Sequence, residues 1–334
     1  MSIIDLRSDT VTKPTKDMLE AMMNTPVGDD VFGDDPSINK LQQIAAEMFG
    51  MEAALFCPSG TMTNQIAINV HTQPGDEIIC EENSHVYLYE GGGIAKNSGS
   101  SVKLLKGNKG QITAKSIKDA IRADDVHFPK SSLISLENTS NKGGGTCYDI
   151  EEIKAIKQVS QKHGLGYHLD GARLFNALVA TGQIAEEYGR AFDSISICLS
   201  KGLGCPVGSL LLGTEEFIYH ARRVRKAFGG GMRQAGYLAA AGIYALENNI
   251  DRLKEDHDLA HLLANKLRAA DEVIEVWEPE TNIVVGVLKS YEAVDQYLEK
   301  LKSKGVWAVR FGANMIRMVA HLDVDRKAVE SVSF

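Results

Sequence analysis

Lys201 lies in a glycine-rich run, Ser200-Lys201-Gly202-Leu203-Gly204, that follows an apolar stretch. A lysine amine attacks a carbonyl group only when it is deprotonated, so a reactive lysine benefits from partial burial near other positive charge. Glycine lets the chain turn sharply and lets a bulky ligand approach the backbone. The run makes Lys201 a candidate for imine chemistry, although by itself it fits a solvated loop lysine better.

Asp170 ends the apolar run 167–170, 31 residues before Lys201, and Arg173 follows it. A carboxylate at the C-terminal end of a buried strand faces the crevice in which α/β sheets bind ligands. An aspartate there could keep the pyridine nitrogen of pyridoxal 5'-phosphate (PLP) protonated, and Arg173 could contact the phenolic oxygen of PLP or a substrate carboxylate. Without Lys201, a helix cap would be the preferred interpretation of Asp170.

An anion site is predicted where a strand at 53–57 meets a helix at 59–70. The free N–H groups and the dipole of a helix N-terminus attract phosphate. Gly60 permits close approach of a ligand, and the hydroxyl of Thr61 can donate to it. Simple capping of the helix by Ser59 is an equally good interpretation of this motif alone.

Four further residues could hold anionic groups. Lys226 and Arg233 belong to a basic, glycine-rich stretch that is either a solvated helix end or additional positive charge around a phosphate. Arg317 is flanked by apolar residues in a predicted strand, where an arginine is costly to bury without a partner. Arg317 and Ser8 are therefore candidates for gripping a substrate carboxylate.

Two histidines, His85 and His127, follow or precede predicted strands. The ring of His85 could stack on a pyridine ring after the strand at 76–80. A lone histidine is more often structural or merely exposed, and this caution applies to both residues.

Short apolar runs alternate with amphipathic stretches, which is the βαβ rhythm of an α/β protein with a mostly parallel sheet flanked by helices. A helix at 37–49 is predicted to be capped by Ser37 and ended by Gly50. After residue 270 the order strand, helix, strand, strand predicts a small α+β domain. We place the large domain, with the N-terminal segment, at 1–250 and the small C-terminal domain at 251–334.

The composition excludes several classes of partner. The 334 residues carry a net charge of −8, whereas binding to nucleic acid needs an excess of Lys and Arg. No apolar stretch reaches the roughly 18 residues of a membrane helix, and acidic residues come too early for a signal peptide. The five cysteines show no metal spacing and fit reduced thiols. We expect a cytoplasmic protein without a nucleic-acid or membrane partner and without an essential metal.

The order of the phosphate loop, the histidine, the aspartate and the lysine resembles that of the aspartate-aminotransferase-like PLP enzymes of fold type I. The resemblance is closest to the low-specificity L-threonine aldolases and covers nearly the whole chain. It is carried by the segments RSDTVTKP (7–14), VGDDVFGDDP (27–36), HLDGAR (168–173), LSKGL (199–203) and GGGMRQ (229–234).

The resemblance implies cleavage of L-threonine, L-allo-threonine or both to glycine and acetaldehyde, in a homotetramer with active sites at the dimer interface. It implies that Lys201 carries PLP, Asp170 binds the ring nitrogen and His85 stacks on the ring. Further cofactor contacts are expected from Gly60, Thr61, Arg173 and Ser200, and from Lys226 and Arg233 of a neighbouring subunit. Substrate contacts are expected from Ser8, Arg173 and Arg317, and His85 and His127 are the candidate bases for the β-hydroxyl proton.

Two positions depart from the family's pattern: Phe32 stands where many relatives carry Tyr, and Ser140 where His is common. Both could alter rate or selectivity. The chain also ends at Phe334, soon after a helix predicted from about Asp325, which is short for the family's closing helix.

Three other functions remain open. Within the same fold, an aminotransferase or a β-eliminating lyase on another small amino acid is the alternative, and a binding protein without turnover is a third. A dehydrogenase is disfavoured because no Gly-x-Gly-x-x-Gly follows the first strand.

Overall fold

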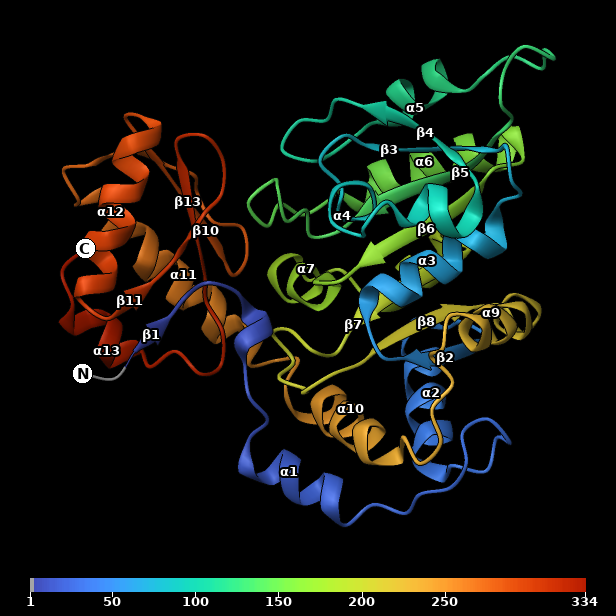
Figure 1. Cartoon of the computed structure of the whole chain (residues 1–334), viewed down its shortest axis with the longest axis horizontal. Coiled ribbons are helices and arrows are strands. Elements are labelled where there is room, and N and C mark those ends of the chain that lie inside the picture. The colour runs from blue at the N-terminus through green and yellow to red at the C-terminus, as the bar shows by residue number, and fades with distance from the viewer. Residues whose placement is uncertain (1–2) are drawn as a thin grey trace.

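The computed structural model describes residues 3–334, and Figure 1 shows a larger and a smaller sheet-containing part. The larger part is built on a seven-stranded sheet of order β2-β8-β7-β6-β5-β3-β4. β8 alone runs opposite to the other six strands, so the prediction of a mostly parallel sheet is confirmed. The strands are β2 (Ala53–Cys57), β3 (Glu77–Glu81), β4 (Ser101–Leu105), β5 (Ser131–Glu137), β6 (Gly166–Gly171), β7 (Ser194–Cys198) and β8 (Ser209–Gly213).

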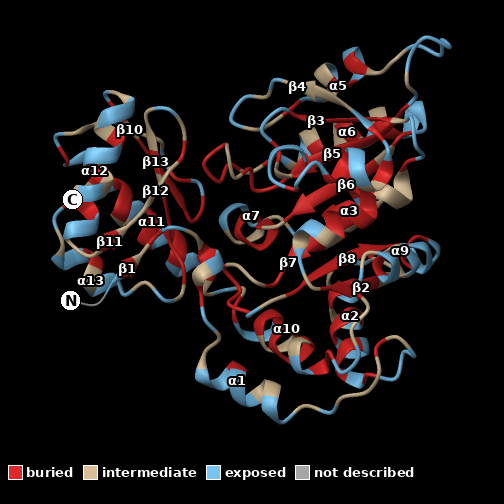
Figure 2. Ribbon diagram, in the orientation of Figure 1, coloured by how far each residue is buried: buried red, intermediate tan, exposed pale blue. Residues whose placement is uncertain are grey.

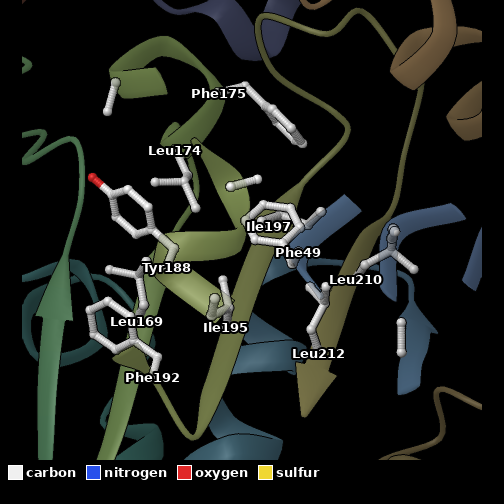
Figure 3. Close-up of a cluster of buried hydrophobic side chains, with 14 of the residues drawn as sticks. Phe49, Leu169, Leu174, Phe175, Tyr188, Phe192, Ile195, Ile197, Leu210 and Leu212 are labelled. Atoms are coloured by element: carbon white, nitrogen blue, oxygen red, sulfur yellow. The ribbon is translucent and has the colours of Figure 1, made fainter. Parts of the chain in front are cut away.

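Helices cover both faces of this sheet, because successive strand residues point to opposite faces and both sets are apolar. Leu210 and Leu212 belong to one hydrophobic core and Leu211 to another. Figure 2 shows the strands as the most buried layer, and Figure 3 shows part of the first core. That core lies under α1 (Lys16–Met23), α2 (Pro36–Phe49), α5 (Ala114–Ala120), α6 (Ile150–His163), α7 (Leu174–Thr181), α8 (Ala185–Ala191) and α10 (Gly236–Asn248), and the second lies under α3 (Gly60–His71) and α9 (Glu215–Ala227).

The predicted cap of α2 was wrong. Asp35, not Ser37, is the N-cap, and its Oδ1 accepts from the backbone N–H groups of Ser37 and Ile38, each at 3.1 Å. Pro36 occupies the first helical position, where its missing N–H costs nothing, and this places the cap one residue before it. The predicted end at Gly50 is confirmed by its left-handed φ of 59°.

The smaller part contains a four-stranded antiparallel sheet of order β12-β13-β10-β9. The N-terminal strand β1 (Ile4–Asp5) pairs with β11 (Val306–Trp307), so the start of the chain joins this part. The remaining elements are α11 (Leu253–Arg268), β9 (Val273–Val276), β10 (Ile283–Leu288), α12 (Tyr291–Ser303), β12 (Val309–Arg310), β13 (Met315–Val319) and α13 (Arg326–Ser331). A separate core around Leu263, Tyr297 and Ile316 agrees with a two-domain organisation, whose boundary at 250–251 stays a prediction.

Across residues 3–334, no helix combines the length and the apolar character needed to cross a bilayer.

Candidate active site

Two adjoining cavities, of about 200 and 350 Å³, lie at the C-terminal ends of the parallel strands, and His85 and Lys201 line both. His85 begins the short helix α4 (His85–Leu88) after β3, and Lys201 follows β7. The inner cavity is further lined by Ser59, Gly60, Thr61, Asn64, Asp170, Ala172, Cys198 and Ser200. The outer cavity is further lined by Ser8, Thr10, Tyr89, Asn141, Lys142, Arg173, Val309, Arg310, Phe311 and Arg317.

The start of α3, where an anion site is predicted, lines the inner cavity. Ser59 caps the helix, since its Oγ accepts from the N–H of Met62 at 3.2 Å. Gly60 is required there, because a Cβ at this position would meet the Sγ of Cys198 at 2.5 Å. The capping interpretation is confirmed, and the anion site stays a prediction, which the free N–H groups of a helix N-terminus would favour.

Asn64, which lines the inner cavity, connects the buried carboxylates of Asp170 and Glu90. Its Nδ2 donates to Asp170 and to Glu90, each at 2.9 Å, and its Oδ1 lies 3.1 Å from Nε2 of His168. Burial lowers the pKa of His168 to about 3, so its ring is neutral. Because an amide oxygen only accepts, Nε2 of His168 must carry the proton.

Hydrogen bonds continue from His168 away from the cavity. The bare Nδ1 of His168 accepts from the hydroxyl of Ser194 at 2.9 Å, and that oxygen lies 2.8 Å from Nε2 of His71. Burial lowers the pKa of His71 to about 4, so its ring is neutral. Because the Ser194 hydroxyl proton is used toward His168, Nε2 of His71 carries a proton and donates to the Ser194 oxygen. The two carboxylates of Asp170 and Glu90, which only accept, set the orientation of the Asn64 amide, and the direction of the relay follows from it.

Glu90 orients the ring of His85. Nδ1 of His85 lies 3.0 Å from Oε1 of Glu90, whose other oxygen accepts from Gln65 at 2.6 Å. Burial lowers the pKa of His85, but the hydrogen bond to Glu90 and the charges of Asp170 and Glu137 outweigh it and raise the pKa above its ordinary value. Because Nδ1–H donates to a carboxylate, the neutral ring has its lone pair on Nε2.

His85, Glu90 and Asp170 each offer one atom that could bind a metal ion, and these three atoms lie within 4.8 Å of one another. Amide N–H groups of Asn64 and Gln65 are directed at the two carboxylates, so these oxygens already accept hydrogen bonds from the protein.

Glu137 ends β5 beside Asp170, which it faces across the parallel register. Its two oxygens accept from the backbone N–H groups of His85 at 2.7 Å and Asn141 at 2.8 Å. Burial and the charge of Asp170 raise its pKa to about 7, against the opposing effect of these hydrogen bonds. This carboxyl group therefore titrates near neutral pH.

Arg173 lies between the N-terminal segment and the outer cavity. It donates two hydrogen bonds, each of 2.7 Å, to the carboxylate of the buried Asp9. Burial opposes ionisation of Asp9, yet the charge and hydrogen bonds of Arg173, with Lys201 and Asn282, bring its pKa down to about 2. Arg173 is thus rigidly held and already paired with a carboxylate of its own chain.

Arg317, unlike Arg173, has no carboxylate partner among the described residues. Nη1 donates to Asn141 at 2.6 Å and Nη2 to the carbonyl of Arg7 at 3.0 Å, while the buried Nε has no partner. Burial and the charge of Arg173 lower its pKa to about 10. In residues 3–334 no carboxylate forms an ion pair with it, and Ser8 lines the same cavity.

Five sequence-predicted positions lie outside both cavities of this chain. The side chain of His127 is 82% exposed and bonds Asp125. Arg233 pairs with Asp29 at 2.9 Å and lies over the exposed ring of Phe32. Lys226 lies beside Gly231. Ser140 is buried and its Oγ accepts from the N–H of Gly143 at 3.1 Å. The structure of one chain brings none of them to Lys201.

Four functional candidates, Asp9, Asn64, Glu90 and Glu137, were missed. Glu137 directly follows the apolar run at 133–136, so the strand-end argument used for Asp170 could have found it. Asp9 adjoins Ser8 in a motif that the resemblance uses. No local spacing marks Asn64 or Glu90, because their contacts arise only from the fold.

The donor set fits PLP: a helix N-terminus without room for a Cβ at Gly60, a strand-end carboxylate at Asp170 and the amine of Lys201 line one cavity. The fold and site define a PLP-dependent lyase of fold type I. The profile of the β-eliminating lyase family matches residues 5–290.

Close relatives narrow the class. The low specificity L-threonine aldolase of Escherichia coli (strain K12) is 45% identical, over 99% of this chain and 97% of the relative. The probable low-specificity L-threonine aldolase 2 of Arabidopsis thaliana is 42% identical, over 98% and 95%. The Leishmania major threonine aldolase structure shares the fold, with a TM-score of 0.84 and 22% identity over 98% and 97%. The chain belongs to the low-specificity L-threonine aldolase family.

Proposed function

We propose that the chain cleaves L-threonine, L-allo-threonine or both to glycine and acetaldehyde, with PLP as cofactor. The observation that carries the proposal is the pair of adjoining cavities that share Lys201, with Asp170 in the inner and the unpaired Arg317 in the outer one. Identities of 42–45% to relatives named as threonine aldolases support it.

In the inner cavity, Lys201 would hold PLP covalently, Asp170 would bind the pyridine nitrogen and His85 would contact the ring. Gly60 and Thr61 at the start of α3, together with Ser200, would bind the phosphate. When bound, PLP accepts the electron pair left on the substrate α-carbon as its bond to the β-carbon breaks.

In the outer cavity, Arg317 and Ser8 bind the substrate carboxylate, and Arg173 is held beside them by Asp9. Arg317 suits this role because it is half-buried and, within the part of the chain that the structure describes, its Nε is buried without a hydrogen-bond partner and it carries no carboxylate partner of its own. Two fixed contacts to the carboxylate set the direction in which the Cα–Cβ bond points.

The β-hydroxyl proton needs a base. Within one chain, His85 is the candidate, because Glu90 holds its Nδ1–H and leaves Nε2 able to accept a proton, directly or through water. His127 is too exposed on its own chain to serve there and could act only in the cavity of another subunit.

We also propose a cytoplasmic homotetramer in which Lys226, Arg233 and His127 complete the site of a neighbouring subunit. All three lie outside the cavities of their own chain. Exposed apolar side chains near them, Phe32 at 75% and Val126 at 99%, support burial against a second copy.

The test is a coupled assay for acetaldehyde with L-threonine and with L-allo-threonine, together with quantification of glycine. Equal amounts of glycine and acetaldehyde are expected from at least one of the two substrates. A keto acid formed only with an amino acceptor would indicate an aminotransferase, and ammonia with a keto acid would indicate a β-eliminating lyase; either would overturn the proposal.

A further inference from the structure

Lys142 lines the outer cavity, yet cleavage of threonine gives it no role. It follows β5 in the loop that contains Asn141 and is half-buried. Its Nζ donates to the carbonyl of Phe311 at 2.8 Å and lies 4.4 Å from the centre of that ring and 5.7 Å from the ring of Tyr89. One of its three N–H donors is therefore used, and two remain.

The charges of the outer cavity leave Lys142 without an anionic partner. Of the cations lining it, Arg173 is paired with Asp9 at 2.7 Å and Arg310 with Asp295 at 2.6 Å. Lys201 is committed to PLP and Arg317 to the α-carboxylate of the substrate. No carboxylate among residues 3–334 lines this cavity or forms an ion pair with Lys142.

The positions of Lys142 and Arg317 suit one small dianion. The guanidinium carbon of Arg317 lies 5.6 Å from the centre of the Phe311 ring, and Nζ of Lys142 lies 4.4 Å from it, so the two cations are at most 10.0 Å apart. A dicarboxylate with four carbons in all, the two carboxylate carbons included, spans about 6 Å between its outer oxygens. With a charge-assisted hydrogen bond of about 2.8 Å at either end, it reaches across this separation.

We propose that Lys142 binds a second anionic group on the β-carbon of the substrate, so that L-3-hydroxyaspartate is cleaved in preference to its neutral analogues. The inference rests on the proposed function and names a substrate class for the same site. The base removes the β-hydroxyl proton, the C–O bond becomes a carbonyl and the Cα–Cβ bond breaks. The electron pair stays on Cα, which takes up a proton, so the products are glyoxylate and glycine and no further reactant is needed.

The first test compares kcat/KM of the PLP-loaded enzyme for L-threo-3-hydroxyaspartate and for its nearly isosteric amide, L-threo-3-hydroxyasparagine. A hydrogen bond to a charged group predicts a preference of at least about tenfold for the acid. Lys142→Met should reduce this ratio by about tenfold, and Lys142→Arg should keep most of it. Lys109→Met is the matched control, because Nζ of Lys109 also lies over a ring, 5.6 Å from Trp277, but outside the cavity.

The second test measures binding without turnover, by calorimetry of L-aspartate and L-asparagine with the same holoenzymes. Both ligands lack the β-hydroxyl group and cannot be cleaved by this reaction. L-Aspartate should bind at least about tenfold more tightly to the wild type, and Lys142→Met should remove this preference.

The possible failures are distinct. Cleavage of threonine with an acid-to-amide ratio of one or less, or with a ratio unchanged in Lys142→Met, would overturn the inference and leave the proposed function intact. If no 3-hydroxy amino acid is cleaved, the proposed function fails, and the calorimetric preference still decides whether Lys142 binds a second anion.

Discussion

Substitution of Asp9 by Asn should destabilise the protein strongly, although the two side chains have nearly the same shape. Asp9 is fully buried and accepts two hydrogen bonds from the equally buried Arg173. Asn cannot neutralise Arg173, so the variant leaves a buried charge without its counter-ion, which is far more costly than the loss of a surface ion pair.

The magnitude follows from the pKa of Asp9, which falls from 3.8 to about 2 on folding. Such a shift corresponds to about 2.5 kcal/mol in favour of the folded state with Asp9 ionised. Removing one member of a buried ion pair typically costs about 3–5 kcal/mol, so we expect a loss of about 3 kcal/mol in the free energy of unfolding.

The lowered pKa of Asp9 also determines how its contribution to the free energy of unfolding changes with pH. A depressed pKa contributes stability that is present above pH 3.8 and is lost as the pH falls through about 2. Asp9 is therefore ionised in both the folded and the unfolded chain from pH 6 to pH 8. The difference between wild type and Asp9→Asn should be the same at both pH values.

The assay is urea unfolding followed by circular dichroism, at equal protein and saturating PLP concentrations because ligand and subunit binding add to stability. Asp5→Asn is the control, since Asp5 pairs at 2.7 Å with Arg7, whose side chain is 45% exposed, and should cost less than about 1 kcal/mol. An Asp9→Asn variant no less stable than this control, or a difference that changes between pH 6 and pH 8, would refute the reasoning.

Glu137→Gln should remove a pH dependence of stability: the pKa of Glu137 is raised from 4.5 to about 7, so its contribution is full below pH 4.5 and lost as the pH rises through 7. Urea midpoints of wild type and variant should therefore diverge between pH 5 and pH 8 in favour of Gln, and parallel curves would contradict this. Glu90→Gln should lower the pKa of His85 and move the acid limb of kcat/KM to lower pH; an unmoved limb would exclude His85 as the titrating base. Gly60→Ala should weaken PLP binding at least about tenfold in a fluorescence titration, because the new Cβ meets Cys198; an unchanged Kd would show that the phosphate is bound elsewhere.

Most strands of the main sheet could be predicted from sequence because they are short, largely buried apolar runs. Ala53–Cys57 has the predicted bounds. Ser101–Leu105 was missed because it is an edge strand with one partner and only partial burial, which leaves a weak apolar signal.

The site was predictable where a residue follows a strand or belongs to a recognisable motif, as for Lys201, Asp170 and Gly60. The partners that set charge and orientation were not, because Glu90 reaches His85, and Asp9 reaches Arg173, only through the fold. The sequence likewise gives no sign that Lys142 faces the same cavity as Arg317.

The most direct test of the central assignment is to locate the lysine that binds PLP. The holoenzyme is reduced with borohydride, which fixes the imine as a stable amine, and the digested protein is analysed by mass spectrometry. The predicted result is a pyridoxyl group on the peptide that contains Lys201. In Lys201→Ala, both this label and the cleavage of threonine should be lost. A pyridoxyl group on Lys142 or Lys226, or threonine cleavage retained in Lys201→Ala, would contradict the assignment.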